Sequence, residues 1–181
     1  MNQQTAVILA AAIAAAIAAI ATLFVTLYNN KRQSKLEYEK WIRTREDQID
    51  KEFRSAIAEL SRKIVVGSHR IIWLAWKAKN DPTGLKEEDF LTYDKNMGDV
   101  FPDIVGARVL VSAFNRQAHN EITPFVRVLY DLDEKVAHAT KSFKDSPKAS
   151  IEALEKLYDE TVKFDSKFLE MITDITGLNR N

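Results

Sequence analysis

The amino-terminal part of the chain is a long apolar segment. Residues 6–28 carry no charged side chain, and as a helix rising about 1.5 Å per residue they span about 34 Å, slightly more than a hydrocarbon core of roughly 30 Å. The large apolar side chains together favour insertion by roughly 3–6 kcal/mol. The pattern predicts one slightly tilted transmembrane helix within residues 1–30.

Basic residues follow this segment, and none precedes it. Lys31, Arg32 and Lys35 stand directly after the apolar run, and the positive-inside rule keeps such residues in the cytoplasm. A cleaved signal peptide needs positive charge before a shorter apolar core. We therefore expect an uncleaved anchor in a bacterial inner membrane, with the N-terminus outside and the bulk of the chain cytoplasmic.

Small residues recur at every fourth position of the predicted transmembrane helix. Such a row lets two helices approach closely in a membrane, so it is a candidate packing face for self-association or for a membrane partner. The face consists of Ala6, Ala10, Ala14 and Ala18. In so alanine-rich a helix the row also arises from composition alone, and both interpretations stay open.

Residues 31–79 predict one long helix, because the segment has no proline and only one glycine, Gly67. From residue 53 onward, apolar residues alternate at spacings of four and three, which is the seam of a helix in a coiled coil or helical bundle. The seam consists of Phe53, Ile57, Leu60, Ile64, Gly67, Ile71, Leu74 and Ala78. We expect Gly67 to permit a close approach of a neighbouring helix.

Residues 31–52 carry charge on every face and predict a solvated juxtamembrane stalk. Glu39 and Arg43 have the favourable order for an ion pair on the helix surface. The alternative is that the basic residues hold anionic lipid headgroups, but interspersed glutamates weaken that attraction.

Further helices are expected after residues 80–84, whose Asn, Asp, Pro, Thr and Gly have turn chemistry and end the long helix. A short helix is predicted over residues 85–97, followed by a break at 98–103, where a glycine and a proline occur. Apolar residues at helical spacing then predict a longer helix over residues 104–143, which Pro124 should kink or split.

A final helix is predicted to start at Ser146 and Pro147, an N-cap and N1 pair, and to end at a Gly177 C-cap. Because short connections make successive long helices antiparallel, the helix over 104–143 should return along the first and the last should run out again. The predicted fold is all-α: a transmembrane helix, a stalk helix and an antiparallel three- to four-helix bundle over residues 53–181.

Charge is balanced over the chain but not along it. Residues 31–79 contain 13 Lys and Arg against 7 Asp and Glu, whereas residues 80–181 contain 13 against 19. The preferred interpretation is that the acidic later helices partly neutralise the basic first one. The near-neutral whole and the scattered basic residues argue against nucleic-acid binding.

The sequence offers no set of residues for catalysis or for a cofactor. It has no cysteine, and none of His69, His119 and His138 follows a glutamate by three residues, as metal sites in helical bundles require. Glu134 and His138 come nearest and are expected to form a surface pair. Phosphate-binding loops and nucleophile motifs are also missing. We therefore expect no enzyme, no cofactor, no metal and no small-molecule substrate.

Residues 71–76 are apolar around the whole helix and need a cover in the folded protein. The preferred cover is the next helix and its end, through Phe90, Leu91, Tyr93, Met97 and Phe101. The alternative is a patch that binds a protein partner, because Trp and Arg are common anchors of interfaces. This candidate patch consists of His69, Arg70, Trp73 and Trp76.

The anchor ends in a pattern of aromatic, asparagine and basic residues, formed by Tyr28, Asn29, Asn30, Lys31, Arg32, Trp41, Arg43 and Arg45. In this pattern the chain resembles a loose group of uncharacterised bacterial single-span membrane proteins with a cytoplasmic helical bundle. The resemblance covers the anchor and the stalk and implies no activity. The topology alone is similar to that of the LemA-type proteins, and no site residue is carried over.

Two functional hypotheses follow from these patterns. The leading one is a membrane-tethered, non-enzymatic helical adaptor or scaffold that presents its cytoplasmic bundle to a protein partner or to copies of itself. The alternative is a self-assembling effector of defence or toxin type, whose alanine-rich spans associate and perturb the bilayer. The first depends on the tryptophan patch and the second on the alanine face.

Overall fold

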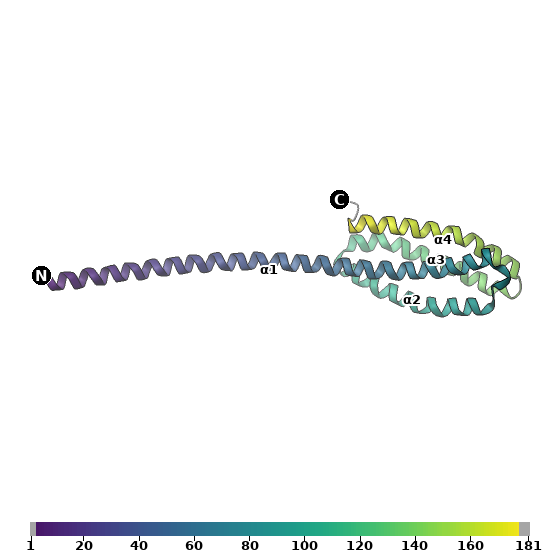
Figure 1. Cartoon of the computed structure of the whole chain (residues 1–181), viewed down its shortest axis with the longest axis horizontal. Helices are drawn as coiled ribbons and strands as arrows, with labels where there is room; N and C mark the ends of the chain where they lie inside the picture. The colour runs from purple at the N-terminus through teal and green to yellow at the C-terminus, as the bar shows by residue number, and fades with distance from the viewer. Residues whose placement is uncertain (1–2, 178–181) are drawn as a thin grey trace. The chain divides into compact units, whose positions relative to one another are not determined.

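The computed structural model describes residues 3–177, without the side chains of Gln3, Thr5, Ala6 and Ala10. These residues form four α-helices and one 3-10 turn and no strand, which confirms the all-α prediction (Figure 1). The elements are α1 (Gln3–Asn80), η1 (Pro82–Gly84), α2 (Glu87–Phe114), α3 (Arg116–Phe143) and α4 (Pro147–Thr176). The chain divides into two compact units, one up to Ile49 and one from Asp50 onward.

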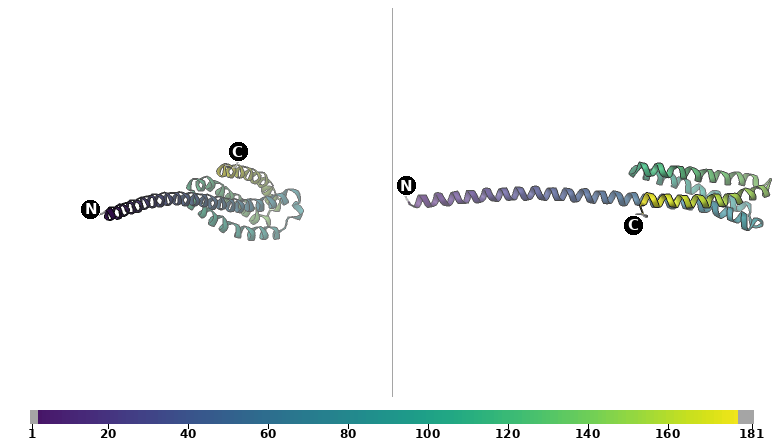
Figure 2. Two further views of the ribbon diagram at one scale, coloured as in Figure 1. Left: turned by 60° about the vertical axis from the view of Figure 1, so that its left-hand side comes forward. Right: turned by 90° about the horizontal axis from the view of Figure 1, so that it is seen from above.

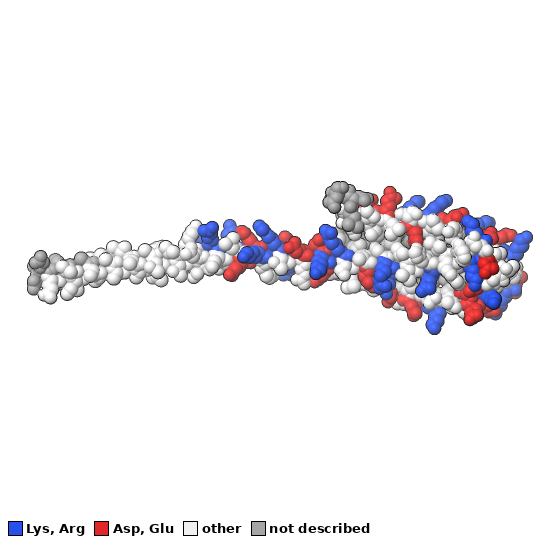
Figure 3. Space-filling model, in the orientation of Figure 1, with Lys and Arg blue, Asp and Glu red and all other residues white. Residues whose placement is uncertain are grey.

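The first unit contains the amino-terminal part of α1 and its apolar stretch. This stretch is long and apolar enough to cross a membrane, and none of it is buried. The hydroxyls of Thr22 and Thr26 donate to the carbonyls of Ala18 and Thr22 over 2.8 Å each. These polar groups are therefore satisfied within the helix, as apolar surroundings would require. In Figure 3 the described part of the stretch is white, and blue and red appear only after it.

The second unit is held by one apolar core to which all four helices contribute. The predicted seam of α1 is part of it: every seam residue from Ile57 to Ala78 is buried, and Phe53 is half-buried. α2, α3 and α4 each contribute a row at spacings of three and four, as one apolar helix face does. The largest fully buried side chains are Ile57, Leu60, Ile64, Ile71, Leu74, Phe90, Ile104, Ile122, Leu129, Leu132, Leu154 and Phe168.

Ion pairs fix the directions of α1 and α2 in this unit. Lys77 pairs with Asp89 near the start of α2, whereas Lys63, earlier in α1, pairs with Asp103, later in α2. The two helices therefore run in opposite directions. The connection begins at Asp81, whose carboxylate accepts from the Gly84 N–H over 3.0 Å, so the predicted turn after α1 is confirmed.

Ring contacts give the directions of the other helices. Phe90 of α2 meets Phe143 of α3 at 4.8 Å between centroids, and Phe101 meets Tyr130 at 4.4 Å. Phe125 of α3 packs on Phe164 and Phe168 of α4, whereas Lys135, later in α3, pairs with Glu160, earlier in α4. Each helix therefore reverses the direction of the one before it (Figures 1 and 2).

The predicted break at residues 98–103 is wrong, because α2 continues through Gly98 and Pro102. Proline removes the hydrogen bond to the carbonyl four residues earlier, and that carbonyl belongs to Gly98, which is exposed to solvent. Water can therefore satisfy it. The buried row of Met97, Val100 and Ile104 runs across the proline and favours an unbroken helix.

The break occurs instead at Asn115, where φ is −148° and ψ is 104°. Its side-chain oxygen accepts from the Ala118 N–H over 3.0 Å and caps α3, which is the usual role of asparagine before a helix. Pro124 lies inside α3 without splitting it. α4 starts after Ser146 and ends at Gly177, whose φ of 69° makes it the predicted left-handed C-cap.

This shift of the break changes the predicted path of the last helix. With a short second helix, the last helix was expected to run in the direction of the first. α2 instead has 28 residues, so it crosses the whole unit and α4 becomes the fourth long helix. α4 therefore runs opposite to the α1 segment beside it, and Lys79 pairs with Asp159 while Ser68, earlier in α1, meets Asp165, later in α4.

Two glycines provide a test of the close packing around α1. A Cβ at Gly67 would lie 3.1 Å from a Leu129 methyl carbon and 3.4 Å from one of Val100, whereas a Cβ at Gly106 would meet nothing within 4 Å. Gly106→Ala should stabilise the protein by about 0.5–1 kcal/mol through helix propensity. Gly67→Leu should destabilise it by about 1–3 kcal/mol through overpacking.

Both variants are to be measured by urea unfolding of the full-length protein in detergent micelles, followed by circular dichroism. Gly67→Ala is the intermediate case, because its gain in helix propensity is offset by the contact with Leu129. An unfolding midpoint that Gly67→Leu leaves unchanged would contradict the filling of the space beside Gly67 by Leu129 and Val100.

Candidate functional site

The exposed side of α1 in the second unit presents two indole rings. Trp73 and Trp76 are each 48% exposed, although Leu74 and Ala75 between them are fully buried. The rings lie one helical turn apart and hence on the same side of α1. The Lys77 ammonium lies 5.5 Å from the centre of the Trp73 ring, within the range of a cation–π contact.

The predicted cover of residues 71–76 is confirmed for Ile71, Leu74 and Ala75, which are buried, but it does not extend to the two tryptophans. Phe90, Tyr93 and Met97 are buried, but they belong to the same core as Ile71 and Leu74. Leu91 is 63% exposed, and Phe101 is half-buried against Tyr130. A helix cannot turn all its faces to one neighbour, so α2 covers one side of α1 and leaves the indoles open. The structure therefore places the candidate patch His69, Arg70, Trp73 and Trp76 on the surface.

A small pocket adjoins this patch between α1 and α2. It has a volume of about 130 Å³ and is lined by Arg70 and Trp73 of α1 and by Thr92, Tyr93 and Asn96 of α2. Antiparallel pairing brings these two turns together, since the flanking pairs of Lys77 with Asp89 and of Lys63 with Asp103 set the register. The sequence pattern had pointed to Tyr93 only as a cover, and it gave no signal for Thr92 or Asn96.

Tyr93 is fixed by a buried contact behind this pocket. Its hydroxyl donates to Asp133 of α3 over 2.6 Å. Burial, and then the hydrogen bond to Asp133, raise the pKa of Tyr93 above its ordinary value. Burial also raises the pKa of Asp133, with Asp94 adding to the effect and the Tyr93 hydrogen bond opposing it. Tyr93 therefore stays neutral and turns its hydroxyl inward.

A second polar contact joins α1 to α4 beneath the patch. The hydroxyl of Ser68, a fully buried residue, donates to one oxygen of Asp165, and His69 Nε2 lies 3.5 Å from the other. Burial raises the pKa of Asp165, while the Ser68 hydrogen bond and His69 lower it in part. His69 is thus connected to the packing of α4, although most of its side chain is exposed.

Lys77 is held by an ion pair at the other end of the patch. Its ammonium lies 2.7 and 2.8 Å from the two oxygens of Asp89, and both side chains are largely buried. Burial opposes the charged form of Asp89, but the hydrogen bonds from Lys77 and from the Lys86 backbone outweigh it and lower the pKa of Asp89. Lys77 is therefore occupied within the unit.

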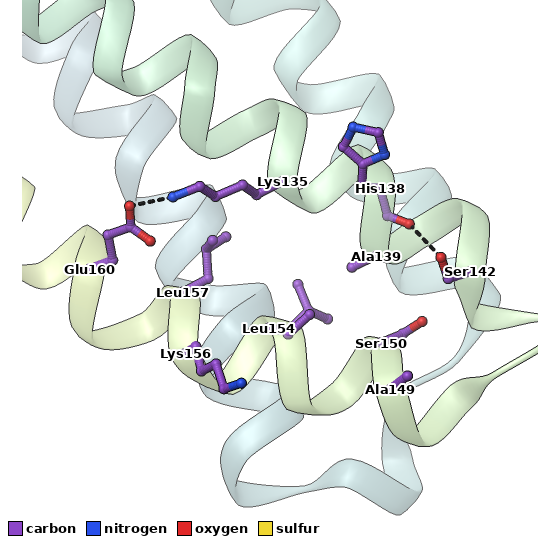
Figure 4. Close-up of a pocket in the computed structure, with 11 residues that line it drawn as sticks. Lys135, His138, Ala139, Ser142, Ala149, Ser150, Leu154, Lys156, Leu157 and Glu160 are labelled. Atoms are coloured by element: carbon purple, nitrogen blue, oxygen red, sulfur yellow. Dashed lines mark hydrogen bonds and ion pairs between the residues drawn. The ribbon is translucent and has the colours of Figure 1, made fainter.

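A larger hollow of the second unit lies elsewhere, between α3 and α4 near their connection (Figure 4). Its floor includes Leu154 and Leu157, its walls include Ala139 and Ala153, and the ion pair of Lys135 with Glu160 closes one side. His138 lies at the rim and pairs with Glu134 at 3.8 Å on the surface, as predicted. Because alanine and leucine side chains line most of its interior, this groove is apolar and offers no cluster of groups for catalysis or metal binding among the described residues.

The remaining residues predicted from the sequence, the basic residues after the anchor and the alanine face, lie in the first unit. Lys31, Arg32 and Lys35 are exposed on α1, and the Lys35 ammonium lies 4.0 Å from Glu39. Glu39 therefore pairs with Lys35, and the predicted pair with Arg43 is not among the ion pairs of the described residues. Of the candidate alanine face, Ala14 and Ala18 are exposed. The side chains of Ala6 and Ala10 lie outside what the structure describes.

Comparisons with known proteins add no assignment to this geometry. No family model matches the chain, and no curated protein and no solved structure is similar to it. Within residues 3–177, no three His, Asp or Glu side chains gather as ligands for a metal ion. The tryptophan patch and its pocket are therefore the surface on which a functional proposal can be built.

The raised pKa of Asp165 gives a prediction for stability. The protonated carboxyl contributes stability that is fully present below the ordinary aspartate pKa and is lost as the pH rises through the raised pKa of the folded protein. Asp165→Asn cannot ionise and still accepts from Ser68. The free energy of unfolding of the variant should therefore change less between about pH 4 and pH 7 than that of the wild type.

The measurement is urea unfolding of the full-length protein in micelles across that pH range. Ser68→Ala is the informative companion, because it removes a donor that favours the charged carboxylate. Its destabilisation should be larger at neutral than at acid pH. Equal pH dependence in the wild type and in Asp165→Asn would show that Asp165 titrates normally.

Proposed function

We propose that the protein is a membrane-tethered, non-enzymatic adaptor that presents its second unit to a protein partner. The observation that carries this proposal is the half-exposed pair of Trp73 and Trp76, whose two indole rings lie one turn apart on the same side of α1. Large apolar rings on a surface lose contact with water when a partner covers them, and Trp with a neighbouring Arg is the usual centre of an interface.

The tether in this proposal is the apolar part of α1. Two observations support this assignment. The stretch is long and apolar enough to cross a membrane, and none of it is buried against the rest of the protein. Lys31, Arg32 and Lys35 then orient the anchor with the N-terminus outside and the second unit in the cytoplasm. The proposed site is the inner membrane of a bacterium.

A self-assembling membrane effector is the second candidate. It is favoured by the exposure of Ala14 and Ala18, since no other described residue covers this side of α1. In a bilayer, small residues let identical helices pack by close van der Waals contact. The two candidates differ in which surface of α1 meets another protein, and crosslinking distinguishes them.

The adaptor predicts a specific crosslink from the tryptophan patch. In native membranes, a photo-reactive residue in place of Trp73 should crosslink to a different protein, and the same residue in place of Val109, which is exposed on α2, should not. Trp76→Ala should weaken the crosslink from position 73, because it removes half of the patch. Val105→Ala, at another exposed apolar position, is the matched control and should leave it unchanged.

Circular dichroism separates this effect from unfolding. Trp76→Ala should cost less than the about 3–5 kcal/mol expected for truncating a fully buried tryptophan. Crosslinks from position 73 that are equal to those from position 109 would refute the adaptor. Crosslinks only from position 14, and only to copies of the same chain, would establish the effector instead.

The orientation of the anchor gives a further prediction. The chain has no native cysteine, so single cysteines can report on each side of the membrane. The cells are treated so that the reagent reaches the outer side of a sealed inner membrane. There, Gln4→Cys should react with an impermeant maleimide. Ser166→Cys, at an exposed position of α4, should react only after the inner membrane is permeabilised. Changing Lys31, Arg32 and Lys35 to Gln should weaken this asymmetry. The opposite labelling pattern would place the second unit outside.

A further inference from the structure

Arg70 differs from the other basic residues of its segment of α1. Arg62, Lys63, His69, Lys77 and Lys79 each lie within 4.0 Å of a carboxylate of the same unit. Arg70 is exposed, and no ion pair to it occurs among the described residues. A guanidinium keeps its charge at any physiological pH. The segment therefore carries one positive charge that the fold does not neutralise.

The pocket beside Arg70 contains two further polar side chains, Thr92 and Asn96. Thr92 and Asn96 make no side-chain hydrogen bond within the described part of the chain, and the Tyr93 hydroxyl is turned toward Asp133. No lining residue is acidic. The pocket thus combines a guanidinium, a hydroxyl and an amide, all able to donate, with the apolar faces of Trp73 and Tyr93.

We propose that this pocket binds a carboxylate side chain of an acidic peptide segment in the partner protein. A planar guanidinium accepts a carboxylate through two parallel hydrogen bonds, and Thr92 and Asn96 provide further donors beside it. An apolar residue one helical turn or two strand positions away in the peptide lies on Trp73 and Trp76. This inference rests on the proposed adaptor function and names the chemistry of its partner.

The size of the pocket favours a peptide over a lipid. A volume of about 130 Å³ holds the end of one side chain and leaves no room for an acyl chain. The two indoles beside the pocket lie one helical turn apart along α1. This spacing matches that of successive apolar side chains on one face of an amphipathic peptide. The bound side chain should be negatively charged, because the only charged group lining the pocket is the positive Arg70.

The test uses the full-length protein in uncharged detergent micelles and a fluorescein-labelled peptide of the repeat Leu-Leu-Glu-Glu, which places a leucine both two and three positions from a glutamate. Fluorescence anisotropy should show saturable binding, and a matched peptide with glutamine for glutamate should bind at least about tenfold more weakly. Arg70→Gln should weaken binding of the glutamate peptide by about tenfold or more, and Arg70→Lys by less, because it keeps the charge but loses the planar fork.

Arg62→Gln is the matched control, since Arg62 is exposed on the same helix and pairs with Glu59. It should leave the affinity unchanged, and both Arg variants should retain the helical circular dichroism of the wild type. Equal binding of the two peptides, or an equal loss in Arg70→Gln and Arg62→Gln, would overturn the proposal. So would the absence of peptide binding together with Arg70-dependent binding to phosphatidylglycerol vesicles, which would assign the pocket to lipid headgroups.

The adaptor itself is judged separately by the crosslink from position 73. If Arg70→Gln leaves that crosslink and the peptide affinity intact, the adaptor stands and the carboxylate site is refuted. If position 73 gives no crosslink in the wild type, the adaptor fails, whatever the peptides do.

Discussion

Burial of the α1 seam is the constraint on which the second unit depends. From Ile57 to Ala78 this seam has a residue of the core at every turn, and α2, α3 and α4 all contribute side chains that cover it. At Gly67 the space is filled by side chains of the neighbouring helices, because a methyl group there would lie 3.1 Å from a Leu129 methyl carbon. A helix with such a stripe is stable only when other helices remove it from water. Only the positions of α1 outside this seam are then free to contact another molecule.

Polar contacts decide which helices pair over this apolar core. Ser68 with Asp165 joins α1 to α4, Tyr93 with Asp133 joins α2 to α3, and Lys77 with Asp89 joins α1 to α2. Apolar packing alone has little directional preference, whereas a buried carboxylate without its donor is costly. Each contact therefore penalises a shift in register. Two of these three carboxylates have raised pKa values, so they specify the pairing at some cost in stability.

Much of this architecture could be predicted from the sequence, and the failures have physical causes. The seam of α1, the turn at Asp81, the start at Ser146 and the Gly177 cap follow from spacing and from local chemistry. The helix break was misplaced because Pro102 was weighed as a breaker, whereas the continuity of the buried row of α2 across it decides. The cap at Asn115 is local and was detectable. The pocket was not, because Thr92 and Asn96 acquire their meaning only when α2 lies antiparallel to α1.

The charge asymmetry of the sequence also bears on the surface of α1 around Arg70. Basic residues of α1 meet acidic residues of the later helices, as in the pairs of Lys63 with Asp103, Lys77 with Asp89 and Lys79 with Asp159. These three pairs neutralise half of the excess of six basic residues over residues 31–79, in line with the partial neutralisation that the sequence suggested. Arg70 remains outside it and lies beside two indoles that the core leaves half exposed. About half of each indole is exposed, so Arg70, Trp73 and Trp76 together present a positive charge beside apolar rings, which a carboxylate next to an apolar group complements.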